Sequence, residues 1–185
     1  MSSDNDSLYV ALHASGAKQT MSTGEDLYHW ALLVGPKIDE RDLQREREAP
    51  GHRFHAITRV EGPERQPVWR FEEVQLPMKP SSMQLVRIVV GRVQDMGQLR
   101  KIFEQIPVQP GTPGWNYEWT KAALEAATQD GNALSASVPD WESVKSTAMS
   151  YAQQKKDAHR FDGRIYYDRD QAATWDMLED TEKIV

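Results

Sequence analysis

The alternation of apolar and polar residues in the first half of the chain predicts a group of β-strands. Apolar, aromatic and β-branched residues gather in five short runs, separated by Gly, Pro, Ser and charged residues. The third and fourth runs flank a turn that contains Gly62 and Pro63, which predicts a hairpin. The fifth run is rich in Val and Ile, as strands are. The predicted strands cover residues 8–14, 28–34, 53–60, 67–74 and 84–91.

The second half of the chain has the periodicity of helices. The first predicted helix has apolar residues at helical spacing, and Pro107 ends it. Its apolar positions are Met96, Leu99, Ile102, Phe103 and Ile106. Two more helices are predicted over residues 115–128 and 141–157, and residues 174–178 are expected to dock as a short turn. An antiparallel sheet followed by a helical group indicates an α+β fold.

One domain is expected to take up all 185 residues, because a chain of this length can bury one sizeable core. Residues 1–7 are polar and are predicted to form a disordered tail. Residues 36–52 form a charged excursion between two strands, with few candidates for the core. A solvated loop containing a short helix is the main interpretation of this excursion, and a moving lid is the alternative.

Composition excludes several classes of function. The net charge is −6, so we expect no nucleic-acid partner. The chain has no cysteine, which excludes disulfides and thiolate chemistry. Because no apolar run approaches the roughly 20 residues of a membrane span, and the N-terminus does not resemble a signal peptide, we expect a cytoplasmic protein. Nucleotide-binding and H-E-x-x-H motifs do not occur, so we expect neither a cofactor nor a metal site.

Two histidines lie on consecutive predicted strands. His29 is in the run Tyr-His-Trp, and His55 is in the run Arg-Phe-His. Adjacent antiparallel strands could place these imidazoles side by side as a catalytic pair, and half-buried structural histidines are the alternative. Glu72 and Glu73 follow on the next strand, where neighbouring residues point to opposite faces, so we expect both carboxylates to be solvated.

A helix is predicted to start in the segment Gly-Trp-Asn-Tyr-Glu-Trp, after a loop rich in Gly and Pro. Asn116 is a good N-cap residue, which would put Tyr117 at the first helical position. A group at that position is close to the positive end of the helix dipole. The alternative is a Trp/Tyr cluster that packs a helix end.

These motifs together resemble known proteins. A His on one strand, a second His on the next, and Asn-Cys at a helix start is the order found in circularly permuted papain-like enzymes. These enzymes include the lecithin:retinol acyltransferase group and the permuted deubiquitinating peptidases. The chain also resembles an uncharacterised family of small fungal proteins with Tyr-His-Trp-Ala-Leu, Gly-Trp-Asn-Cys and Lys-Lys-Asp-x-His-Arg-Phe motifs, matched here by residues 28–32, 114–117 and 155–161. The resemblance implies a permuted papain-like fold.

The chain departs from this pattern at the nucleophile, because Tyr117 takes the place of the Cys. A phenol with a pKa of about 10 is a poor replacement for a thiolate. The resemblance therefore implies a site with changed chemistry, in which His29, His55 and Tyr117 are the catalytic residues. The substrate-binding residues would be Trp30, Trp115, Asn116 and Trp119.

The function expected from such a site is that of a cofactor-free cyclase or isomerase, acting on an apolar small molecule in fungal secondary metabolism. Orientation within an apolar pocket, together with one hydrogen bond to a carbonyl, suits an intramolecular cycloaddition or isomerisation. One alternative is a non-catalytic papain-like module that binds a protein or peptide. Another is a hydrolase or acyltransferase with a different nucleophile. The oligomeric state is left open.

Overall fold

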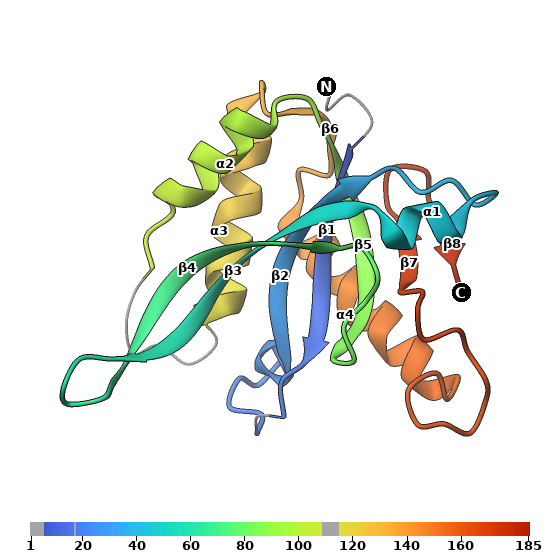
Figure 1. Ribbon diagram of the computed structural model, residues 1–185, viewed down its shortest axis with the longest axis horizontal. Helices are drawn as coiled ribbons and strands as arrows, with labels where there is room; N and C mark the ends of the chain where they lie inside the picture. The colour runs from blue at the N-terminus through green and yellow to red at the C-terminus, as the bar shows by residue number, and fades with distance from the viewer. Residues whose placement is uncertain (1–5, 17, 109–114) are drawn as a thin grey trace.

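A large open sheet forms the centre of the molecule, which Figure 1 shows as a computed structural model, and the three long helices pack on one face of this sheet. The structure describes residues 6–16, 18–108 and 115–185, and in this part of the chain there are eight strands and four α-helices. The predicted α+β class is therefore confirmed.

The sheet has the strand order β4-β3-β2-β1-β5-β7-β8, and β6 also pairs with β5. The five predicted strands are present as β1 (Asp6–Ala14), β2 (Tyr28–Pro36), β3 (Pro50–Glu61), β4 (Gln66–Pro77) and β5 (Gln84–Val93). Three short strands were not predicted: β6 (Leu134–Ser137), β7 (Ala173–Asp176) and β8 (Thr181–Ile184). The turn expected at residues 174–178 is thus wrong, because Ala173–Asp176 pairs in parallel with β5. Four residues give too short a pattern to recognise as a strand.

The helices are α1 (Leu43–Glu48), α2 (Met96–Gln105), α3 (Trp115–Asp130) and α4 (Trp141–Asp157), with a 3-10 turn, η1 (Glu25–Leu27). Aspartates cap three of them: the carboxylates of Asp42, Asp95 and Asp140 each accept a backbone N–H at the start of α1, α2 and α4. The expected N-cap role of Asn116 is wrong. Because α3 already begins at Trp115, Asn116 is the second residue of the helix, and its side chain binds the sheet instead.

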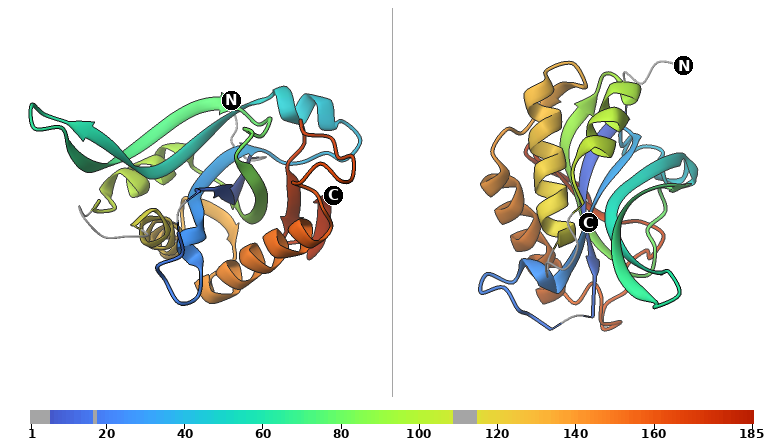
Figure 2. Two further views of the ribbon diagram at one scale, coloured as in Figure 1. Left: turned by 90° about the horizontal axis from the view of Figure 1, so that it is seen from below. Right: turned by 90° about the vertical axis from the view of Figure 1, so that its left-hand side faces the viewer.

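The two faces of the sheet have different cores. Leu12, Trp30 and Phe54 belong to the main core, which packs against α2, α3 and α4. Residues one position along the strands, such as Ala11 and Leu33, point to the opposite face and join a smaller apolar cluster. In the right-hand view of Figure 2, α3 and α4 (yellow and orange) lie on one side of the central strands, and the β3–β4 hairpin (teal) curves round on the other.

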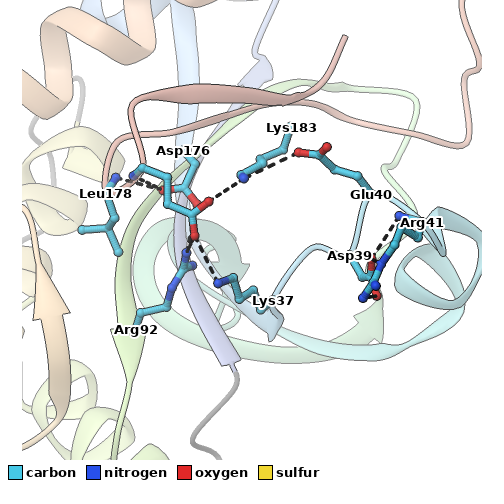
Figure 3. A network of polar contacts seen from close by, with 9 residues as sticks. Lys37, Asp39, Glu40, Arg41, Arg92, Asp176, Leu178 and Lys183 are labelled. Atoms are coloured by element: carbon cyan, nitrogen blue, oxygen red, sulfur yellow. Dashed lines mark hydrogen bonds and ion pairs between the residues drawn. The ribbon is translucent and has the colours of Figure 1, made fainter.

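Strands include residues that were expected in the tail and in the charged excursion, because β1 begins at Asp6, β2 ends at Pro36 and β3 begins at Pro50. Strand β1 begins at Asp6 and Ser7 is buried, so these two residues belong to the sheet, whereas residues 1–5 lie outside the described part. The excursion is also tied to the sheet. Glu46 on α1 is buried and lies 2.6 Å from the guanidinium of Arg87 on β5. At the outer edge of this region, Lys183 on β8 contacts Glu40 (Figure 3).

Candidate functional site

The structure brings His29 and His55 together. The two histidines come from β2 and β3, and Nε2 of His29 lies 2.9 Å from Nδ1 of His55. Their rings meet edge to face, with centroids 5.1 Å apart. His55 is buried, whereas His29 is partly exposed, so His29 is the member of the pair that reaches solvent.

Glu72 extends this pair into a chain of three groups. It lies directly opposite His55 in the β3–β4 hairpin, and its Oε1 is 3.1 Å from Nε2 of His55. The same carboxylate accepts a hydrogen bond from Arg59. Glu72 and Glu73 do point to opposite faces, but neither is simply solvated, because Glu73 is held by Arg100 on α2.

His13 is a third histidine at this place, and the sequence analysis missed it. It is buried at the end of β1, directly opposite His29 in the sheet register. Its Nδ1 lies 3.4 Å from the backbone carbonyl of His29, and the two rings are 5.9 Å apart. The strand period of two is the signal that could have identified His13. It places His13 on the same face of β1 as Ala11, which is the face that His29 shares.

The hydrogen-bond pattern assigns the protons of the chain. A carboxylate only accepts, so Nε2–H of His55 donates to Glu72. Nδ1 of neutral His55 is then the acceptor, so Nε2–H of His29 donates the hydrogen bond between the two rings. This leaves the lone pair of neutral His29 on Nδ1, at the outer end of the chain.

Burial and charge keep the three imidazoles neutral at pH 7. Burial, followed by the charge of Arg53, lowers the pKa of His13 to about 4. Burial, followed by repulsion between neighbouring histidines, lowers the pKa of His29 to about 3. The pKa of His55 is also lowered by burial, although Glu72 opposes the change. For Glu72 itself, burial raises the pKa, but hydrogen bonds from Arg59 and His55 outweigh it and the net shift is downward.

Tyr117 lies apart from the histidines, in the core between the sheet and the helices. Its hydroxyl accepts a hydrogen bond of 3.1 Å from Nε1 of Trp141, and its ring packs against Trp30 with centroids 5.2 Å apart. Among the hydrogen bonds of the described residues, none joins Tyr117 to His29 or His55. Because Trp30 follows His29 in a strand, its side chain points to the other face of the sheet.

The expected substrate-binding residues are also part of this core. Trp30 and Trp119 are fully buried, and Trp119 packs against Phe71 of β4. Asn116 accepts a hydrogen bond of 3.2 Å from the backbone N–H of Trp30, which attaches the start of α3 to β2. The side chain of Trp115 lies outside the described residues. Two surface hollows, one beside α1 and one beside residues 160–172, are lined by neither His29 nor Tyr117.

Within the described residues, no group of three or more His, Asp or Glu side chains is arranged to hold a metal ion. The same part of the chain contains no helix that is long and apolar enough to cross a membrane.

The fold and this site define an α+β protein with a carboxylate–imidazole–imidazole chain on the face of the sheet opposite α2, α3 and α4. A family model described as a family of unknown function (DUF6914) matches residues 5–184. The chain therefore belongs to this family. Comparison with curated proteins and with solved structures finds no match in either set.

Proposed function

We propose that the protein is a cofactor-independent enzyme that moves a proton within an apolar small molecule, as an isomerase or cyclase. The observation that carries this proposal is the continuous hydrogen-bonded chain from Glu72 through His55 to His29. A neutral imidazole at the outer end of such a chain is a general base.

The chain supports proton transfer in both directions. Nδ1 of His29 takes a proton from the substrate, and the electron pair of the broken bond stays on the substrate. The proton on Nε2 of His29 shifts toward His55, and the carboxylate of Glu72 stabilises the positive charge that develops on the imidazoles. Return of the proton to a different substrate atom completes an isomerisation. Attack of the electron pair on an electrophilic carbon of the same molecule, followed by return of the proton, completes a cyclisation.

In this proposal Tyr117 is a structural residue, since its hydroxyl is occupied by Trp141. The permuted papain-like ancestry is part of the proposal. It is supported by the order of His29, His55 and the helix start, and by the bond of Asn116 to β2 beside His29. A fungal setting in secondary metabolism and a cytoplasmic location belong to the proposal as well, and the motif resemblance and the composition support them.

The test is proton abstraction from 5-nitrobenzisoxazole, a neutral probe whose ring opens when a base removes one C–H proton. We expect His29→Gln to lower the second-order rate constant by about tenfold or more, because the base is lost. His52→Gln is the matched control, since His52 lies on the same hairpin but on the helix side, bound to Glu73. Equal rates for the wild type and His29→Gln, with both proteins folded, would refute the proposal.

A further inference from the structure

Arg53 lies on the same face of the sheet as the histidine chain. It is two residues before His55 on β3, and strand residues two apart share a face. In the sheet register it is opposite Leu33 of β2 and Val74 of β4. The side chain is half-buried, so one part of it lies in the sheet surface and another part reaches solvent.

This guanidinium has no anionic partner among the described residues. Its Nε is buried and makes no hydrogen bond in this part of the chain. The nearest carboxylates along β4 are already bound, because Glu72 is held by Arg59 and His55, and Glu73 by Arg100 on the other face. A buried donor without a partner is costly, most of all when it carries a charge.

The positive charge of Arg53 acts on all three histidines of the cluster. Burial is the main cause of the low pKa of His13, His29 and His55, and the charge of Arg53 lowers each of these pKa values further. An anion bound to Arg53 would remove this repulsion. The imidazole of His29 would then become a stronger base while the substrate is bound.

We propose that Arg53 binds a carboxylate of the substrate, beside the imidazoles of His13, His29 and His55. This inference rests on the proposed function, for which it names the substrate class: an apolar molecule that carries a carboxylate. A planar guanidinium matches a carboxylate with two parallel hydrogen bonds. A monoanion suits the site better than a phosphate dianion, because Glu72 is near and the whole chain has a net charge of −6.

The test is a titration with benzoate, followed through the histidine signals in NMR spectra. Benzoate should give saturable shifts of the His13, His29 and His55 signals and raise the pKa of these imidazoles. Arg53→Gln should weaken binding by about tenfold or more, which corresponds to the loss of a charge-assisted hydrogen bond. Arg65→Gln, which removes an exposed positive charge at the turn of the same hairpin, is the control and should leave the affinity unchanged.

If Arg53→Gln does not fold, Arg53→Lys takes its place. It keeps the charge but loses the paired hydrogen bonds, so we expect weaker benzoate binding than in the wild type. Wild-type affinity in a folded Arg53 variant, or the absence of saturable shifts in the wild-type protein, would overturn the carboxylate site. Tighter binding of inorganic phosphate than of benzoate would overturn the choice of a carboxylate.

The two proposals fail separately. Benzoate binding does not need proton transfer, and 5-nitrobenzisoxazole has no carboxylate. Benzoate that binds through Arg53, without proton abstraction that depends on His29, would refute the proposed function only. Proton abstraction that depends on His29, without binding of benzoate, would refute the carboxylate site only.

Discussion

Acid should destabilise this protein in a pH range where most proteins of its size still fold, and the histidine cluster is the reason. His13 and His29 have pKa values of about 4 and about 3 in the folded chain, against 6.5 for an ordinary histidine. As the pH falls below 6.5, the unfolded chain binds protons that the folded chain does not. Protonation therefore favours unfolding, so the stability is complete above pH 6.5 and is lost as the pH falls toward these folded-state values.

The size of the loss in the free energy of unfolding follows from the number of histidines that bind a proton on unfolding. Each of the two histidines changes the free energy of unfolding by ~1.4 kcal/mol per pH unit. Between pH 6.5, where the unfolded histidine is half protonated, and about pH 4.5, each should lose ~2.2 kcal/mol, and the pair more than ~4 kcal/mol. A natural domain is stable by only about 5–15 kcal/mol, so this loss should be plainly visible. Carboxylates in ion pairs contribute at lower pH: the hydrogen bond from Lys183 lowers the pKa of Glu179 from 4.5 to about 2.

The assay is urea unfolding followed by the fluorescence of the six tryptophans, at several pH values between 7 and about 4.5. The slope of the free energy of unfolding against pH should reach ~2.7 kcal/mol per unit in the wild type from His13 and His29 together, with a further contribution from His55, whose pKa is also lowered in the folded chain. For His13→Gln the slope should be ~1.4 kcal/mol per unit smaller than in the wild type. The smaller slope of this variant is the internal control, because the variant lacks the proton that unfolding adds to His13. A change of less than about 1 kcal/mol across this range in the wild type would refute the reasoning.

Two further substitutions test contacts inside the fold. Glu46→Gln should lower the free energy of unfolding by about 3 kcal/mol in urea, because it leaves the buried charge of Arg87 without its partner; a loss under about 1 kcal/mol would contradict this. Tyr117→Phe should cost about 1–2 kcal/mol through the lost acceptor for Trp141, with no change in the rate of 5-nitrobenzisoxazole opening; a slower reaction in the folded variant would show that Tyr117 takes part in the chemistry.

The parts of the fold that depend on long periodic segments could be predicted from the sequence. The five long strands and the three long helices lie where the apolar period of two or of 3.6 places them. The short strands β6, β7 and β8 could not be predicted, because they form only where β5 and β7 offer a free edge. The depth of Glu46 was also missed. The burial of Glu46 depends on Arg87, which is 41 residues away along the chain. The sequence around Glu46 therefore does not indicate that this carboxylate is buried.

Only the part of the candidate site that depends on neighbouring strands, the two histidines, could be predicted from the sequence. Strand assignment places His29 and His55 on neighbouring strands, and the register of β2 and β3 puts both on one face of the sheet. The role of Glu72 needs the register of the β3–β4 hairpin, since a shift by one residue would place Glu73 beside His55 instead. Tyr117 was assigned to the same site because the motif order suggested it. Residues next to each other in a strand, as His29 and Trp30 are, point to opposite faces, and Tyr117 packs on the face of Trp30.

Because the two faces of the sheet are separate, one short segment can stabilise the fold through Trp30 and carry the proposed base, His29. Trp30 is fully buried against α3 and α4, where it fixes the position of β2. His29, the preceding residue, is thereby held at a constant place on the opposite face, within hydrogen-bond distance of His55. The β3–β4 hairpin carries His55, Glu72 and Arg53, so two of the three groups of the proton chain and the proposed carboxylate site lie on one hairpin. A substrate bound at Arg53 would therefore be held in register with the base on β2, and the rigid core under Trp30 would maintain that register.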